Sequence, residues 1–219
     1  MDSPSVAIVP SETRSLETLF QGYQRLSVRQ RKRWMEILLS FEMKNSYDVH
    51  NESGMPVFRV RELGNGFLSL LKRIFLGPVR PFAAEVIDLA TEKILFLLRR
   101  PFRFFFHRLE VRTGGGEFWG AIERRWSWLR RLYDVQDANG RVVAQLFGPI
   151  LKPWTFEIQV DGVTAGTIRK RWSGLGKEMF TDADNFGVDL SGLSDPRLKA
   201  LAFAATVLID MVHFERAKG

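Results

Sequence analysis

The stretch from Leu198 to Phe214, LKALAFAATVLIDMVHF, is the only long apolar segment of the chain, and it decides what the remainder must fold around. As a helix it would rise roughly 26 Å. A membrane span usually needs about 20 apolar residues, whereas Lys199 and Asp210 bracket a clean apolar run of about ten. The length therefore favours a helix buried in a core, and a helix that is apolar on nearly every side must be enclosed by protein. Four small residues make the helix narrow in this region, so that strands can approach it closely: Ala200, Ala202, Ala204 and Ala205.

Pairs of short segments with alternating polarity, separated by turn residues, precede this helix and are typical of β-hairpins. The predicted hairpins are Tyr47–Val49 with Val57–Val60, Ala83–Leu89 with Ile94–Leu98, Leu132–Gln136 with Val142–Phe147, and Phe156–Val160 with Val163–Lys170. The last is the strongest, because Asp161-Gly162 supplies the positive φ angles of a two-residue type I′ turn. A further pair is predicted from Ser27–Trp34 and Met35–Phe41, and single strands from Phe118–Glu123 and Lys177–Val188.

These segments predict a mainly β protein, a closed antiparallel barrel of about twelve strands around the buried C-terminal helix, because closure removes free strand edges. The domain is expected to span residues 26–219, with the central helix at 198–214. Residues 1–25 are expected to form a flexible tail, in which Leu16, Leu19 and Phe20 could make a short helical turn.

Composition limits the classes of function. Lys and Arg exceed Asp and Glu, giving a net charge of +7, which favours anionic partners such as nucleic acid, acidic proteins or anionic lipid. The absence of cysteine excludes disulfides, thiolate chemistry and S-acylation. The N-terminal residues lack a basic region followed by an apolar one, so a cytoplasmic location is expected.

Conventional catalytic motifs are missing from the sequence. His50, His107 and His213 are scattered without zinc-ligand spacing, and the Gly114–Gly116 run lacks the Lys and Ser/Thr of a P-loop. A Gly-x-Ser-x-Gly nucleophile elbow is also missing. The sequence therefore offers no covalent catalytic constellation, and no cofactor is expected to be required.

The segment Lys177–Val188, which contains TDADNFG, and the helix end Leu208–Glu215, LIDMVHFE, closely resemble the phospholipid scramblase family. Four further segments match in the same order: Phe41–Tyr47, Gly77–Phe82, Phe156–Ile158 and Gly166–Gly174. The resemblance extends over roughly residues 26 to 215. It implies a tubby-like architecture, a twelve-stranded barrel around a central C-terminal helix, and an activity in which phospholipids move in both directions between bilayer leaflets.

Vertebrate members of this family carry acylated cysteine clusters in segments that match Gly64–Gly77 and Pro101–Arg108. Here these segments hold apolar and basic residues instead, so we expect apolar side chains to replace the lipid anchors while each basic residue attracts anionic headgroups by about 1 kcal/mol. The alternative is that the aromatic residues fill the core and the basic ones form a solvated face, although consecutive phenylalanines cannot both face inward on a regular strand. The expected membrane-binding residues are Phe67, Leu71, Lys72, Arg73, Phe75, Arg100, Arg103, Phe105, Phe106 and Arg108.

The resemblance also implies a calcium site, because TDADNFG is interpreted in the family as an EF-hand-like loop. Asp182, Asp184 and Gly187 would hold positions 1, 3 and 6 of that loop, whereas the acid required at position 12 is replaced by Leu193. Asp189 compensates only if the loop has a different shape. The candidate calcium ligands are therefore Asp182, Asp184 and Asp189, and the alternative is that these carboxylates hydrogen-bond turn backbone.

Asp210 lies in the apolar helix, where a carboxylate is costly unless it is paired or protonated. We expect a structural partner near the mouth of the barrel, such as an Arg or a backbone donor. The alternative is that Asp210 forms a polar gate for headgroups.

Three basic clusters stand beside tryptophans, in Arg124–Trp128, Arg130-Arg131 and Arg169–Trp172. This composition is typical both of a membrane interface and of a groove for phosphate or single-stranded nucleic acid. The leading interpretation is a barrel that associates peripherally with an anionic phospholipid membrane on its cytoplasmic face. The alternatives are a binding module for phosphoinositide headgroups or nucleic acid, and a single-span membrane protein with Leu198–Phe214 as the span.

Overall fold

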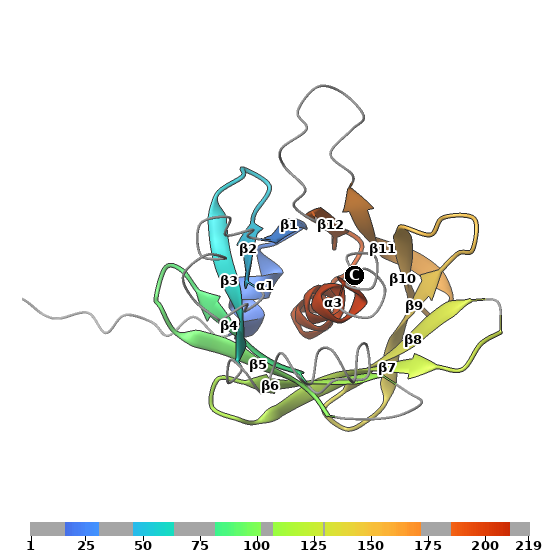
Figure 1. Cartoon of the computed structure of the whole chain (residues 1–219), viewed down its shortest axis with the longest axis horizontal. Coiled ribbons are helices and arrows are strands. Elements are labelled where there is room, and N and C mark those ends of the chain that lie inside the picture. Colours follow the sequence, from blue (N-terminus) through green and yellow to red (C-terminus); the bar gives the residue numbers. More distant parts are fainter. Residues whose placement is uncertain are drawn as a thin grey trace, which may run out of the picture.

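Twelve antiparallel strands form a closed barrel around one helix (Figure 1). The computed structural model describes residues 16–30, 46–63, 82–101, 107–128, 130–171 and 185–210. Each strand pairs with the strands before and after it, and β1 closes the ring by pairing with β12. The elements are α1 (Leu16–Gln21), β1 (Arg25–Gln30), β2 (Ser46–His50), β3 (Pro56–Leu63), β4 (Phe82–Asp88), β5 (Ile94–Arg100), β6 (Arg108–Thr113), β7 (Phe118–Arg125), β8 (Arg131–Asp137), β9 (Val142–Gly148), β10 (Thr155–Val160), β11 (Val163–Arg171), β12 (Asn185–Asp189) and α3 (Pro196–Ile209).

The four predicted hairpins are confirmed as β2–β3, β4–β5, β8–β9 and β10–β11. At the turn of the last one, Asp161 and Gly162 have φ angles of 49° and 79°, as a type I′ turn requires. The predicted pairing of Ser27–Trp34 with Met35–Phe41 is wrong. Strand β1 instead pairs with β12 along one edge and with β2 along the other. Strand β6 was not predicted, and the tubby-like barrel expected from the resemblance is confirmed.

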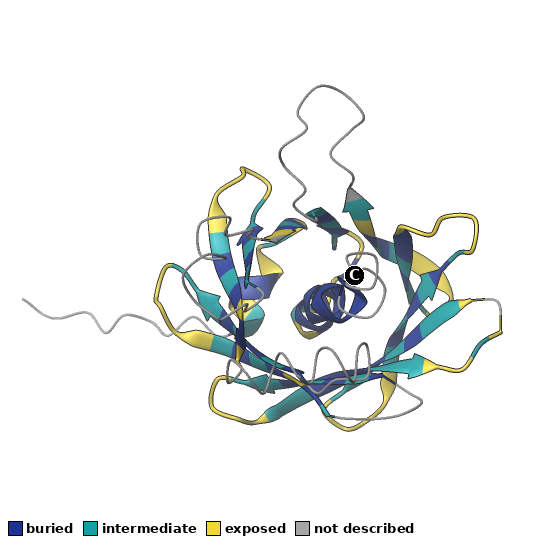
Figure 2. Cartoon of the chain, viewed as in Figure 1, coloured by how far each residue is buried: buried dark blue, intermediate teal, exposed yellow. Residues whose placement is uncertain are grey.

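Helix α3 is the centre of the core. The Asp195 side chain caps its first turn by accepting a hydrogen bond of 2.8 Å from the Arg197 N–H. Every residue from Leu198 to Ile209 is buried (Figure 2). The buried Lys199 ammonium donates hydrogen bonds to the carbonyls of Gln21 at 3.3 Å and Tyr23 at 2.9 Å, which offsets part of its desolvation cost. Among the described residues, no helix is both long enough and apolar enough to cross a membrane.

Helix α1 packs inside the barrel beside α3. The ring of Phe20 is completely buried and lies 5.5 Å from Phe58, 5.7 Å from Phe96 and 6.0 Å from Phe203, measured between ring centroids. The short helical turn expected at Leu16, Leu19 and Phe20 is therefore present. Residues 16–25, which the sequence assigned to a flexible tail, belong to the packed structure because Phe20 is buried against both the strands and α3.

The two ends of the barrel differ in what they carry. At the hairpin end lie α1, the start of α3 and the short turns of the hairpins β2–β3, β4–β5, β6–β7, β8–β9 and β10–β11. At the opposite end, which we call the loop end, lie the last residues of the odd-numbered strands and the first residues of the even-numbered ones. Strand register demonstrates this grouping, since Arg131 pairs with Gly148 and Thr155 pairs with Arg169. Asp210, the residue that follows α3, is also on this side, next to the beginning of β2.

Candidate functional site

Exposed apolar side chains gather with exposed and partly buried basic ones at the loop end, around the connections β7–β8 and β9–β10. We call this cluster the basic rim. Its apolar members are Trp126, Trp128, Ile150, Leu151 and Trp154, and its basic members are Arg124, Arg125, Arg130, Arg131, Lys152, Arg169 and Lys170. The apolar members are far more exposed than isolated surface apolar residues need to be, with Trp128 at 84% and Leu151 at 95%. A group of large apolar side chains on an open surface marks an interaction site.

The two most prominent tryptophans support each other. The rings of Trp126 and Trp128 meet edge to face, with centroids 6.1 Å apart and planes at 87°. Such a pair is stabilised beyond its buried area, so it presents one compact apolar projection instead of two independent side chains. Both residues stand between cations, since Arg125 precedes them and Arg130 follows.

Arg131 fixes the β9–β10 connection rather than facing a ligand. Its guanidinium donates hydrogen bonds to the carbonyls of Pro153 at 2.6 Å, Lys152 at 3.3 Å and Pro149 at 3.4 Å. The same group lies 4.5 Å from the ring centre of Phe156. Burial lowers the pKa of Arg131 from its ordinary value, as desolvation of a cation does. This single residue thereby holds the loop that carries Ile150 and Leu151.

Other basic members of the rim lie over aromatic rings. The guanidinium of Arg130 is 5.4 Å from the ring centre of Phe147, and the ammonium of Lys170 is 5.9 Å from that of Trp154. These cation–π contacts order the long side chains without neutralising their charge. Arg125 is 3.6 Å from Asp134, an exposed ion pair of small energy. The rim therefore keeps a strong positive charge next to its apolar projections.

Two residues expected at a membrane surface make contacts within the protein. Arg100 is only 2% exposed, and its Nη2 lies 2.9 Å from Nδ1 of His107. Arg108 donates hydrogen bonds to Glu123 at 2.7 Å and to Gln136 at 3.1 Å. Alternation explains Arg100, because Phe96, Leu98 and Arg100 occupy the inward positions of β5. Both arginines thus contribute to the fold rather than to an open surface.

The other expected membrane-binding residues lie outside the described part of the chain. They are Phe67, Leu71, Lys72, Arg73, Phe75, Arg103, Phe105 and Phe106. The strands on either side of their segments are described. Leu63 ends β3 and Phe82 begins β4, while Arg100 ends β5 and Arg108 begins β6, all at the loop end. Both segments therefore leave and rejoin the barrel at the end that carries the basic rim.

Of the three candidate calcium ligands, Asp189 is described, whereas Asp182 and Asp184 are not. Oδ1 of Asp189 accepts hydrogen bonds from the Ser191 N–H at 3.1 Å and the Ser191 hydroxyl at 2.7 Å. Burial alone would raise the pKa of Asp189, but these hydrogen bonds and the nearby Arg25 outweigh it and lower the pKa. Within the described residues, no group of three or more His, Asp or Glu is arranged to hold a metal ion. The calcium site at Asp182, Asp184 and Asp189 stays a prediction.

Asp210 has the structural partner that its position requires. It is 2% exposed, and its Oδ2 accepts a hydrogen bond of 2.7 Å from the Tyr47 hydroxyl. The partner among the described residues is the hydroxyl of a tyrosine. The contact joins α3 to β2, which supports the structural role expected for this residue.

The sequence did not single out the rim members of the β9–β10 connection, which are Ile150, Leu151, Lys152 and Trp154. These residues lie in or next to the segment Gly148-Pro-Ile-Leu-Lys-Pro153, which connects β9 to β10 and has no alternating pattern. A usable signal was present, because two adjacent aliphatic residues between prolines interrupt the strand pattern and cannot be part of a sheet.

Comparison with known proteins places these features in context. The family model described as Scramblase matches residues 2–216. The chain is 28% identical to phospholipid scramblase 2 of Bos taurus over 218 residues, which cover 93% of this chain and 72% of that protein. It is 29% identical to phospholipid scramblase 1 of Homo sapiens over 214 residues, 91% of this chain and 65% of that protein. A solved structure of a protein from Arabidopsis thaliana has a similar fold, with a TM-score of 0.51 and 13% identity over 92% of this chain and 96% of that one.

Proposed function

The chain belongs to the Scramblase family, and from this premise we propose that it binds phospholipid membranes through the basic rim and redistributes phospholipids there. The observation that carries the proposal is the placement of Trp126, Trp128 and Leu151, all largely exposed, among cations at one end of the barrel. Tryptophan favours the interface between headgroups and acyl chains. Each nearby Lys or Arg adds about 1 kcal/mol of attraction to an anionic surface.

The two segments that replace the family's cysteine clusters act with the rim in this proposal. Segments 64–81 and 102–106 start and finish at the loop end, as the positions of Leu63, Phe82, Arg100 and Arg108 require. Phe67, Phe75, Phe105 and Phe106 then enter the same leaflet as Trp126 and Trp128. Membrane attachment through several apolar side chains plus cations supplies the two signals that stable peripheral binding needs.

The enclosed position of α3 limits how lipid can move. All residues from Leu198 to Ile209 are buried in the barrel, so the helix contributes no apolar surface to lipid in this arrangement. Lipid movement therefore proceeds at the rim, by perturbing the adjacent leaflet or through assembly of several copies.

Vesicle binding tests the rim directly. Wild-type protein and the triple variant Trp126→Ser, Trp128→Ser, Leu151→Ser are sedimented with vesicles of phosphatidylcholine and phosphatidylserine at low and at 1 M salt. The matched control is the double variant Val142→Ser, Val163→Ser, which removes exposed apolar residues from the hairpin end. We expect the triple variant to bind at least tenfold more weakly, and the control to bind like wild type.

Salt separates this proposal from a module that binds phosphoinositide headgroups or nucleic acid. Contacts to phosphate alone weaken steeply with salt, whereas inserted tryptophans leave binding that persists at 1 M salt. Wild-type binding that vanishes at 1 M salt, together with an unaffected triple variant, would overturn membrane insertion and favour the phosphate-binding module.

Lipid redistribution is tested with vesicles that carry fluorescent phospholipid in both leaflets, using dithionite to quench the outer one, with and without calcium. Quenching well beyond half of the signal is expected for the wild type. Quenching that stops at half while the protein cosediments would restrict the function to membrane binding.

A further inference from the structure

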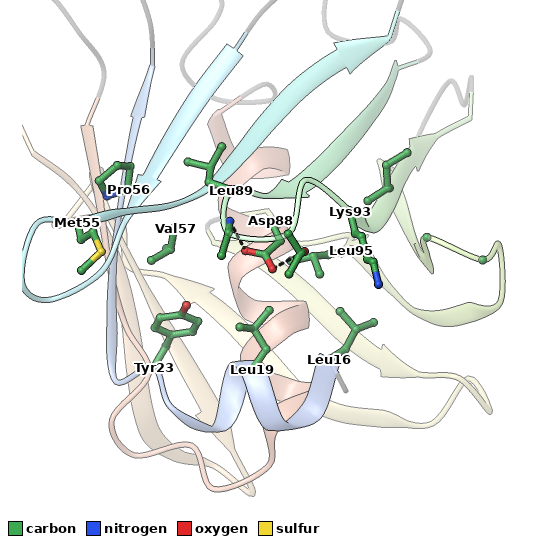
Figure 3. Close-up of a pocket in the computed structure, with 15 residues that line it drawn as sticks. Leu16, Leu19, Tyr23, Met55, Pro56, Val57, Asp88, Leu89, Lys93 and Leu95 are labelled. Carbon is green, nitrogen blue, oxygen red and sulfur yellow. Dashed lines mark hydrogen bonds between the residues drawn. The ribbon is translucent and has the colours of Figure 1, made fainter. Parts of the chain in front are cut away.

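A cavity of about 680 Å³ opens at the hairpin end, far from the basic rim (Figure 3). It lies between α1 and the turns β2–β3, β4–β5 and β6–β7. Its volume is within the range of about 300–1,000 Å³ that is usual for small-molecule sites. The residues that line it are mainly aliphatic, with Leu16 and Leu19 on α1, Val57 and Leu95 on strands, and Leu89 in the β4–β5 turn.

The walls of this cavity are held by backbone hydrogen bonds and by the core. The Leu89 N–H donates to the Val57 carbonyl at 3.0 Å, and the Gly114 N–H donates to the Leu95 carbonyl at 2.9 Å. Leu19 belongs to the core cluster, and Leu16 packs against that cluster. Since these contacts fix the lining from both sides, the cavity is part of the fold rather than a gap between mobile side chains.

Two charged side chains, Asp88 and Lys93, line the cavity, and they differ in their hydrogen-bond partners. Both carboxylate oxygens of Asp88 accept hydrogen bonds inside the β4–β5 turn, Oδ1 from the Ala90 N–H at 3.1 Å and Oδ2 from the Thr91 hydroxyl at 2.8 Å. Lys93 extends from the same turn toward α1 (Figure 3), and no described carboxylate forms an ion pair with it. Lys93 is therefore the cationic donor that the lining offers to an anionic ligand, because both Asp88 oxygens already accept hydrogen bonds within the turn.

We infer that this cavity binds a long-chain fatty acid, with the alkyl chain against the aliphatic lining and the carboxylate at the Lys93 ammonium. An alkyl chain matches walls without unsatisfied polar groups, and an ammonium–carboxylate contact is a charge-assisted hydrogen bond. The inference goes beyond the proposed function, because the site is at the other end of the barrel from the basic rim and takes a single lipid molecule rather than a membrane surface.

Binding is measured with cis-parinaric acid, a polyene fatty acid whose fluorescence rises in apolar surroundings. We expect saturable binding of one probe per protein, displaced by palmitic acid. Hexadecanol, which has the same chain length without a carboxylate, should compete at least fivefold more weakly. Lys93→Met should remove this preference by weakening palmitic acid and leaving hexadecanol unchanged.

A pocket-filling substitution provides the decisive comparison. Ala90 lines the cavity, and Ala138 occupies a similar turn of the hairpin end outside it; both are exposed and lie in turns capped by an aspartate. Ala90→Trp should weaken probe binding at least tenfold, and Ala138→Trp should leave it unchanged. If Ala90→Trp unfolds, Gly115→Leu replaces it, because a Cβ at Gly115 approaches nothing closer than 3.7 Å.

Unsaturable fluorescence in the wild type, equal loss in both tryptophan variants, or full binding by Ala90→Trp and Gly115→Leu would overturn the inference. Vesicle sedimentation of Ala90→Trp keeps the two proposals apart. It should match the wild type, because the basic rim is intact, so failure of the fatty-acid site leaves membrane binding untouched.

Discussion

The hydroxyl of Tyr47 donates a hydrogen bond of 2.7 Å to Oδ2 of Asp210, joining the beginning of β2 to the end of α3 inside the barrel. Both side chains are buried, Tyr47 at 1% and Asp210 at 2% exposure. A buried carboxylate needs such a donor. The contact therefore ties the described end of α3 to β2.

Replacing Tyr47 by Phe should reduce the free energy of unfolding by about 1–3 kcal/mol, because it removes a donor from a buried carboxylate without changing the packed ring. Urea unfolding measures the loss. In a double-mutant cycle with Asp210→Asn, the two changes should be coupled by more than about 0.5 kcal/mol. Strict additivity would show that the hydrogen bond contributes nothing to stability.

Replacing Arg131 by Met should loosen the β9–β10 connection while the barrel remains folded. The substitution removes three hydrogen bonds to carbonyls of this loop, and bonds from charged donors contribute about 1.5–3 kcal/mol each when buried and less at this half-exposed position. Amide exchange of Lys152 and Thr155, whose N–H groups bond within the loop, should accelerate at least tenfold. Arg130→Met is the matched control, and equal exchange in the two variants would argue against the role of Arg131.

Alkaline unfolding should depend on Tyr133. Burial raises the pKa of Tyr133 to about 12, whereas the pKa of the unfolded side chain is about 10. The folded state thus holds the proton of Tyr133 more tightly than the unfolded state does. The resulting contribution to the free energy of unfolding, roughly 2–3 kcal/mol, is complete below about pH 10 and is lost as the pH rises toward 12. Tyr133→Phe should flatten the stability profile between pH 10 and 12. An unchanged slope in urea titrations over this range would contradict the assignment.

Gly120 should tolerate no side chain, because β7 passes close to α3 there. A Cβ at this position would collide with the Gln136 carbonyl oxygen and lie 2.9 Å from a methyl group of Leu201. We expect Gly120→Ala to lower the free energy of unfolding by about 1–3 kcal/mol through overpacking. Gly115→Ala, where the added Cβ would meet Thr113 Oγ1 at an ordinary contact distance of 3.7 Å, should change stability by less than about 0.5 kcal/mol. Similar melting of both variants would disprove the close approach.

Asp189 should act on acid stability rather than on calcium. The pKa of Asp189 is lowered in the folded state. Its contribution to the free energy of unfolding is therefore present above about 3.9, the pKa of an aspartate in the unfolded chain, and is lost as the pH falls through the folded pKa. Asp189→Asn should therefore reduce the loss of stability on acidification. Calcium titration by calorimetry provides the second readout, where Asp182→Asn and Asp184→Asn are expected to weaken binding. Loss of calcium binding in Asp189→Asn alone would reverse this assignment.

The barrel could be predicted because local signals agreed with the final fold. Asp161-Gly162 marked one hairpin, alternation marked the others, and the short apolar run before Asp210 implied an enclosed helix. The role of α1 could not be predicted, since Phe20 stands in a polar stretch and only the strands and α3 show that its ring is buried. Arg100 was misjudged because charge was weighed above its place in the alternation of Phe96 and Leu98. The fatty-acid cavity depends on residues from four segments, which no local pattern brings together.

Closure of the barrel by β1 and β12 determines when the protein can fold during its synthesis. Residues Arg25–Gln30 are translated early, yet one of their two partner strands, Asn185–Asp189, and the helix that fills the core follow more than 150 residues later. Ten other strands are synthesised before β12 can pair with β1 and before α3 can fill the core. Contacts this distant in sequence slow folding, and the apolar inner faces stay uncovered until α3 has been synthesised. The barrel is therefore expected to depend on chaperones until β12 and α3 are available, and then to fold as one cooperative unit.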